Sequence, residues 1–256
     1  MNIVVCLKQT FDTEAKIALN ASGKVDDAGV TSVINPYDEY ALEEGLRLKE
    51  KFGGEVVTVS VGGEKVQAAI RTALATGADR AVLVTDPALD GADEWVVAEV
   101  LAKAISQMPY DIILAGRIAV DDQSAQVAVR LAEVLNLPSV SSVLKMETEE
   151  SKVLATREID GGTEILEVPL PAVFTAQKGL NEPRYPSMMG IMKAKSKEIK
   201  VLTLADLGVT EPLASKTSQP VVTLPGVRQA GVKIQGEALD CAKELVRLLS
   251  EEAKAI

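Results

Sequence analysis

Short apolar runs alternate with amphipathic segments over residues 3–135 of this 256-residue chain. A continuous apolar run between turn signals is typical of a parallel strand buried on both faces, and the amphipathic segments have the spacing of covering helices. The alternation therefore predicts an α/β fold with a doubly wound parallel sheet. The predicted strands are Ile3–Leu7, Glu55–Val61, Arg80–Thr85 and Asp111–Gly116, and the predicted helices are Asp38–Phe52, Glu64–Thr76, Asp93–Gln107 and Gln123–Leu135.

A different pattern begins near residue 140. Four strands are predicted with no helix between them, and the Asp160–Gly162 turn makes two of them an added hairpin region. Residues 203–235 contain three prolines and little periodicity, which is typical of an extended arm. We therefore predict an α/β domain over residues 1–202 and a C-terminal arm over residues 203–256. The four strands are Val140–Met146, Lys152–Glu158, Thr163–Val168 and Ala172–Thr175.

The last amphipathic segment, Glu237–Glu252, predicts a helix at the end of this arm. Its apolar stripe needs a surface to lie on, which is either the chain's own core or a partner subunit. The stripe consists of Leu239, Ala242, Leu245, Val246 and Leu249.

Composition excludes several kinds of function. Asp and Glu number 37 against 27 Lys and Arg, and the net charge of −10 disfavours binding to nucleic acid or an anionic membrane. Histidine is absent, which excludes Ser–His and Cys–His catalytic pairs and histidine-bearing metal sites. Cys6 and Cys241 fit neither a disulfide framework nor a zinc pattern, and no signal peptide or transmembrane run is visible. We therefore expect a cytoplasmic protein with no metal site and no membrane insertion.

The two commonest glycine-rich motifs for phosphate binding are missing from the sequence, so a phosphate would have to be held in another way. The Gly116–Gln126 segment joins a predicted strand end to a helix start, where free N–H groups and Ser124 could hold a phosphate. Asp121 and Asp122 argue against this because carboxylates repel phosphate, and one of them could simply cap the helix. A second candidate is Asn35–Asp38, which is either a base-contacting turn or a proline-set helix entry with Asp38 as its cap.

Two further features leave alternatives open. The Val61–Gly63 turn is either a tight connection or a close approach to a ligand, whereas Cys6 fits a small core residue better than a nucleophile. The segment 176–200 is locally basic, which indicates either a solvated helix face or a docking patch with Leu180 and Tyr185 as its apolar part. Its basic residues are Lys178, Arg184, Lys193, Lys195, Lys197 and Lys200.

Together these segments resemble the β-subunit of electron transfer flavoprotein, nearly from end to end. The resemblance is carried by Val4-Val5-Cys6-Leu7-Lys8, Asn35-Pro36-Tyr37, residues 71–80, the 116–126 segment, Arg157-Glu158-Ile159-Asp160-Gly161-Gly162, Leu180-Asn181-Glu182-Pro183-Arg184-Tyr185 and Ile191-Met192-Lys193-Ala194-Lys195.

The resemblance implies an adenine-nucleotide hydrolase-like α/β fold in a heterodimer with an α-subunit that carries most of the site for the redox FAD. Ordinary members bury a structural AMP in the β-subunit. The implied AMP site comprises Cys6, Asn35, Pro36, Tyr37, Asp38, Val61, Gly116, Arg117, Ile118, Ala119, Val120, Asp121, Asp122, Gln123, Ser124, Ala125, Gln126 and Val127. The implied recognition loop comprises Leu180, Asn181, Glu182, Pro183, Arg184 and Tyr185, with Leu180 as the anchor that enters a dehydrogenase.

The implied function is that of an electron carrier. Electrons would come from acyl-CoA-type dehydrogenases and pass through FAD to a membrane quinone oxidoreductase, so that no residue of this chain acts as acid, base or nucleophile. Electron-bifurcating members hold a second FAD in place of AMP, and Phe11-Asp12-Thr13 and residues 122–126 match their motifs only in part. Thr13 also stands where many members have a tyrosine against the flavin. A universal-stress-type nucleotide-binding regulatory domain is the rival, but it lacks a counterpart of residues 176–256.

Overall fold

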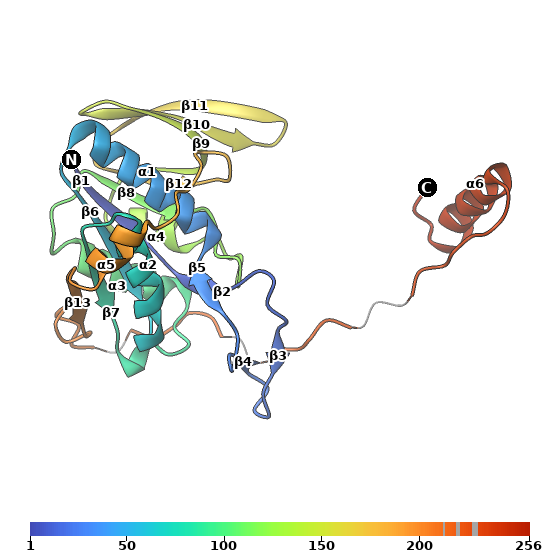
Figure 1. Ribbon diagram of the computed structural model, residues 1–256, viewed down its shortest axis with the longest axis horizontal. Helices are drawn as coiled ribbons and strands as arrows, with labels where there is room; N and C mark the ends of the chain where they lie inside the picture. The colour runs from blue at the N-terminus through green and yellow to red at the C-terminus, as the bar shows by residue number, and fades with distance from the viewer. Residues whose placement is uncertain (212, 219–220, 227–229) are drawn as a thin grey trace. The chain divides into compact units, whose positions relative to one another are not determined.

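The computed structural model describes residues 1–211, 213–218, 221–226 and 230–256 (Figure 1). Pro212 and Pro220 of the predicted arm lie outside these ranges. The chain divides into one compact unit of residues 1–17 and 26–220 and a second of residues 18–25 and 221–256. Within the described residues, no helix has both the length and the apolar character needed to cross a bilayer.

A nine-stranded sheet forms the centre of the first unit, in the order β11-β10-β9-β12-β8-β1-β6-β7-β13. All neighbouring pairs from β9 to β13 in this order are parallel, whereas β10 pairs antiparallel with both β9 and β11. This confirms the doubly wound α/β prediction with its added hairpin. The strands are β1 (Asn2–Cys6), β6 (Glu55–Val61), β7 (Arg80–Val84), β8 (Ile112–Gly116), β9 (Ser139–Thr148), β10 (Lys152–Ile159), β11 (Gly162–Pro169), β12 (Ala172–Ala176) and β13 (Ile199–Leu202).

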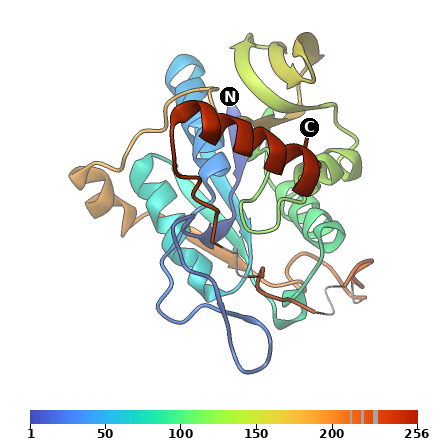
Figure 2. The ribbon, with the colours of Figure 1, turned by 90° about the vertical axis from the view of Figure 1, so that its right-hand side faces the viewer.

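Helices cover both faces of this sheet, which explains the continuous apolar runs (Figure 2). Successive β1 side chains point to opposite faces: Ile3 and Val5 pack in the layer under α1 and α2, whereas Val4 and Cys6 pack in the layer under α3 and α4. All four are buried. The covering helices are α1 (Pro36–Phe52), α2 (Gln67–Thr76), α3 (Glu94–Ile105) and α4 (Val127–Val134).

The predicted start of α4 at Gln123 is wrong. Gln123 and Ala125 have φ angles of 54° and 55°, in the left-handed region that a right-handed helix cannot contain, so α4 begins only at Val127. The residue preceding α4 is Gln126, so neither Asp121 nor Asp122 caps it. Asp38 is no cap either, because Asn35 holds that position in α1.

The sequence also missed the edge strand β13 and the short helix α5 (Met188–Ala194), because mixed apolar and charged residues hide their periodicity. After β13 the chain does not leave the core at once, since Leu204 and Leu207 are still buried in the α3–α4 layer. The remaining short elements are β2 (Gln9–Phe11), β3 (Ala18–Leu19), β4 (Val25–Asp26), β5 (Ser32–Ile34) and the 3₁₀ turns Glu64–Val66 and Pro87–Leu89.

The second unit contains the predicted C-terminal helix, α6 (Ala238–Arg247), which continues as a π-helical turn through Glu252. No residue of α6 is buried, although its apolar stripe is well formed. The helix prediction is therefore confirmed, and the surface that covers the stripe stays a prediction.

Candidate functional site

The topological switch point of the sheet lies between β1 and β8. From β1 the chain proceeds outward to β6 and β7, and then returns to the other side of β1 to form β8. Ligands of open α/β sheets bind beyond the carboxyl ends of the strands at such a point. The ends of β1, β6 and β8 bring together Cys6, Val61 and Gly116, which the family resemblance had assigned to one site. We call this the nucleotide edge, after the ligand that the resemblance predicts for it.

Asp38 and Asn35 join three segments at the nucleotide edge. The Asp38 carboxylate accepts the backbone N–H of Lys8 at 2.7 Å and that of Gly116 at 2.9 Å. The Asn35 amide donates to Asp38 Oδ1 at 3.0 Å and to the Ile118 carbonyl at 2.8 Å, while its oxygen accepts from Val120 at 3.2 Å. Both side chains thus hold the loop after β8 in place, and a contact of Asn35 with a base stays a prediction.

Burial changes the protonation of two groups here. Burial raises the pKa of Asp38 to about 7, against the lowering effect of the N–H donors around it. Burial, together with the Asp38 charge, raises the pKa of Cys6 to about 12. The Cys6 thiol therefore stays protonated and is a poor nucleophile at neutral pH, as the sequence predicted.

Lys8 weakens the main objection to phosphate at this edge. Its ammonium lies 2.8 Å from an Asp121 oxygen and 2.6 Å from an Asp122 oxygen, so it offsets one of the two negative charges that would repel phosphate. Although burial lowers the pKa of Lys8, the hydrogen bonds to both aspartates raise it on balance. No role for Lys8 was predicted from the sequence, although Lys8 belongs to the motif at the first strand and lies immediately beyond the end of β1.

The loop after β8 spans residues 117–126. Asp122 accepts the Ser124 N–H at 2.9 Å, and Ser124 precedes the first turn of α4 instead of lying in it. Ser124 is therefore not part of the helix start and its N–H is occupied by Asp122, which corrects the predicted local geometry, and the binding of a phosphate here stays a prediction. The left-handed conformations at Gln123 and Ala125 are costly for such residues and are typical of ligand-binding loops.

The remaining predicted residues lie around this edge. Pro36 and Tyr37 form the first turn of α1 and are half-buried, as is Val61 at the end of β6. Thr13 is exposed, and its contact with a flavin stays a prediction. Within the described ranges, no group of three or more metal-ligating side chains is placed to hold an ion.

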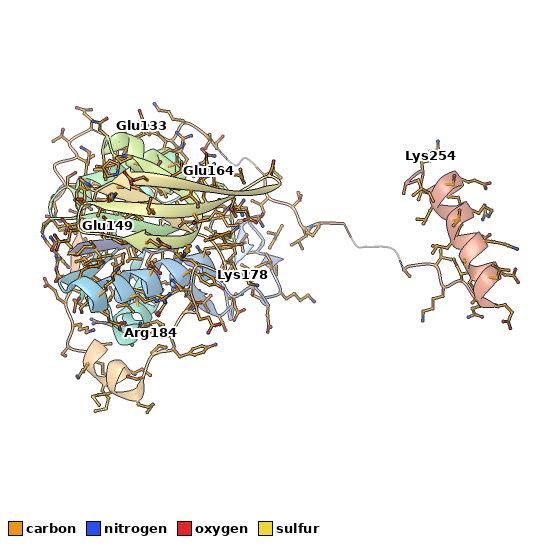
Figure 3. All side chains as sticks on the ribbon, turned by 90° about the horizontal axis from the view of Figure 1, so that it is seen from above. Glu133, Glu149, Glu164, Lys178, Arg184 and Lys254 are labelled. Atoms are coloured by element: carbon orange, nitrogen blue, oxygen red, sulfur yellow. The ribbon has the colours of Figure 1, made fainter. Side chains whose placement is uncertain are left out.

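The predicted docking patch is fastened to the body at two points. On α1, Arg184 pairs with Glu43 and Glu50, and Figure 3 shows it beside that helix. At the end of α2, Lys197 donates to the carbonyl of Leu74 at 2.9 Å and to that of Ala78, just after the helix, at 2.5 Å. These two cations are therefore used within the chain and do not contribute to a free basic rim.

Helix α5 lies between these two points. Gly190 packs against α2 so closely that a Cβ there would lie 2.2 Å from the Ala75 carbonyl oxygen. The outward side of the segment is apolar: Tyr185 is 93% exposed and Met188 is 80% exposed. Leu180, the predicted anchor, is instead partly buried against the core cluster of the α1–α2 layer. Its role as an anchor stays a prediction, and Tyr185 and Met188 are the more accessible side chains.

The fold and the edge define a class: a doubly wound α/β protein whose ligand edge lies at the topological switch point. Residues 22–207 match the model of the electron transfer flavoprotein domain. The electron transfer flavoprotein subunit beta of Bacillus subtilis (strain 168) is 46% identical over 258 residues, with 100% of both chains covered. The chain therefore belongs to the electron transfer flavoprotein family, as the resemblance implied.

Two other relatives with the same description span different lineages. The protein of Syntrophomonas wolfei is 46% identical over 255 residues, which cover 99% of this chain and 98% of the relative. The protein of Bos taurus is 42% identical over 240 residues, which cover 92% of this chain and 93% of the relative. Both similarities extend beyond the α/β unit into the C-terminal region.

Proposed function

We propose that this chain is the β-subunit of a heterodimeric electron transfer flavoprotein. It pairs with an α-subunit that carries most of the FAD site, and the two together pass electrons from acyl-CoA-type dehydrogenases to a membrane quinone oxidoreductase. The observation that carries this proposal is the match of the whole chain, including residues 176–256, to flavoprotein β-subunits. A universal-stress-type domain would account for the sheet but not for this C-terminal third.

The nucleotide edge takes the adenylate in this proposal. The proposed contacts are Cys6, Asn35, Pro36, Tyr37, Asp38, Val61 and residues 116–127. Lys8 supports an anionic ligand here because its positive charge offsets part of the repulsion from Asp121 and Asp122. FAD supplies the redox chemistry when it is bound. The side chains of this chain hold the nucleotides in position and exclude water from around them. AMP is the proposed adenylate, with a second FAD as the alternative.

The docking surface receives the dehydrogenase in this proposal. We define it as Tyr185, Met188, Met189, Met192, Lys193 and Lys195, all of which are exposed. Methionines adapt their shape to different partners, and lysines at the rim attract an acidic one. The helix α6 lies in the C-terminal arm, and its apolar stripe would pack on the α-subunit, which would supply the cover that the second unit lacks.

The test is to co-express the chain with its α-subunit and count the nucleotides released on denaturation. One FAD and one AMP per heterodimer is the expected result, whereas two FAD would indicate the bifurcating type. A yellow heterodimer that an acyl-CoA dehydrogenase reduces in the presence of its acyl-CoA would support the carrier function. A chain that stays monomeric with the α-subunit present, or a pair without flavin absorbance, would overturn it.

A further inference from the structure

Two polar side chains of the segment 180–185 are bound to helix α1 instead of facing a partner. Arg184 donates from Nε and Nη2 to the two carboxylate oxygens of Glu43, at 2.8 and 2.9 Å. It also donates from Nη1 to Glu50 at 2.5 Å, and its backbone N–H reaches Glu43 at 3.2 Å. One guanidinium therefore binds two carboxylates two turns apart on one helix face. The hydrogen bonds to Glu43 and Glu50 raise the pKa of Arg184, so it stays charged.

Asn181 forms the second attachment. Its amide donates to the Tyr40 carbonyl at 3.0 Å and to a Glu44 carboxylate oxygen at 3.0 Å. Burial raises the pKa of Glu44, whereas the Asn181 hydrogen bond lowers it. The loop is therefore attached to α1 by an amide and a guanidinium that lie three residues apart.

Two of the three acceptor carboxylates on α1 are buried. The side chains of Glu43 and Glu44 are 7% and 9% exposed. A buried carboxylate without a partner is costly, so these two side chains favour the loop conformation that brings Arg184 and Asn181 to them. A bidentate pair also restricts orientation more than a single contact does. The attachment thus specifies one position of the loop.

The same helix also holds the nucleotide edge, through its first turn. Asp38, in the first turn of α1, binds the backbone of Lys8 and Gly116. Glu43 follows five residues later, about 7.5 Å along the helix axis at 1.5 Å per residue. Because a helix of this length is rigid over two turns, α1 sets the distance between the nucleotide edge and the loop.

We propose that Arg184 and Asn181 are positioning residues, which fix the docking surface relative to the nucleotide edge by attaching its loop to buried carboxylates of α1. This inference rests on the proposed function and gives these residues a role different from partner contact. Tyr185 follows directly after the attachment and points outward, so a loose attachment would let it and the methionines adopt many positions. A partner would then have to order the loop as it binds, which weakens docking.

The test measures electron transfer from an acyl-CoA dehydrogenase, reduced by its acyl-CoA, to the heterodimer as the varied substrate. For Arg184→Met we expect KM for the heterodimer to rise at least fivefold, with kcat and flavin content unchanged. Asn181→Ala keeps the ion pair and should raise KM by a smaller factor. Arg80→Met is the matched control, since Arg80 makes a similar bidentate pair with Glu55 at 2.9 and 3.0 Å on β7 and β6.

A double variant separates position from stability. Glu43→Gln with Arg184→Met removes the unpaired buried charge, so the melting temperature should recover in part while KM stays high. Recovery of KM along with stability would overturn the proposal, as would an unchanged KM in Arg184→Met. If the wild-type heterodimer accepts no electrons, the proposed function itself fails. If the wild type is active and the Arg184→Met variant has the same KM, only the positioning role fails.

Discussion

The Asp38 carboxylate and the Gly116 backbone lie 78 residues apart in sequence and 2.9 Å apart in the structure. A Cβ on residue 116 would lie 2.3 Å from Asp38 Oδ1 and 2.8 Å from Tyr37 Cβ. Helix α1 and the end of β8 are therefore fitted together at a distance that only glycine permits. The shape of the nucleotide edge depends on this contact.

Gly116→Ala tests the fit directly. The added methyl group must push α1 away from β8, so we expect a loss of about 1–3 kcal/mol in the free energy of unfolding. Urea denaturation followed by circular dichroism measures it. Gly63→Ala is the control, because no atom lies within 4 Å of a Cβ at that position. Equal stability of Gly116→Ala and Gly63→Ala would contradict the close fit.

Asp38 predicts a pH dependence of stability. Its pKa is raised from 3.8 to about 7 in the folded chain, so the folded state retains a proton that the unfolded state releases. Its contribution to stability is therefore greatest below about pH 4 and is lost as the pH rises toward 7, at up to about 1.4 kcal/mol per pH unit.

The measurement is urea unfolding of the wild type and Asp38→Asn at several pH values from 5 to 8. Cys6, Lys8 and Glu39 are present in both proteins, so the difference between the two curves isolates Asp38. We expect the wild type to lose stability relative to the variant as the pH rises from 5 to 7. Parallel curves would mean that Asp38 is ionised throughout this range.

Lys8→Met tests the charge balance at the nucleotide edge and rests on the proposed adenylate. Without the ammonium, Asp121 and Asp122 are left unpaired and repel phosphate, so we expect the heterodimer to retain several-fold less adenylate after dialysis. Nucleotide released on denaturation is counted by chromatography. Lys152→Met is the control, since Lys152 pairs with Glu167 at 2.9 Å on the antiparallel strands. Equal retention by both variants would exclude this role for Lys8.

Two apolar residues, Met188 of the docking surface and the partly buried Leu180, can be compared directly. Met188→Ala should leave stability unchanged because Met188 is 80% exposed, and should raise KM for transfer from the dehydrogenase. Leu180→Ala should instead cost about 1–2 kcal/mol of stability, because Leu180 packs against the core. Thermal unfolding and transfer kinetics of both variants show which of the two residues contributes to docking. The reverse result would support Leu180 as the anchor, as the sequence predicted.

Salt dependence tests the rim of the same surface. If Lys193 and Lys195 steer an acidic partner, the bimolecular rate of reduction should fall as ionic strength rises from 20 to 300 mM, and replacing both by Gln should flatten this dependence. Stopped-flow absorbance of the flavin measures the rate. Lys197→Gln is a useful comparison, because the Lys197 ammonium is bound to the carbonyls of Leu74 and Ala78 at the end of α2. A wild-type rate that does not change with salt would leave the lysines without a steering role.

The amino-acid sequence alone determined the class of fold and the family. Strands buried on both faces must be apolar throughout, and β1, β6, β7 and β8 could be found because this requirement acts on neighbouring residues. The resemblance to the electron transfer flavoprotein β-subunit then implied that Cys6, Val61 and Gly116 belong to one site. These inferences needed only local patterns and motifs.

Only the tertiary structure decided what individual polar residues do. Asp38 looked like a helix cap and Arg184 like a docking residue, because a sequence does not reveal a partner that lies 78 or 141 residues away. The pairing of Lys8 with Asp121 and Asp122 could not be predicted for the same reason. Hydrogen bonds and ion pairs act over about 3 Å, and which groups come that close is set by the packing of α1 against the sheet and the loops.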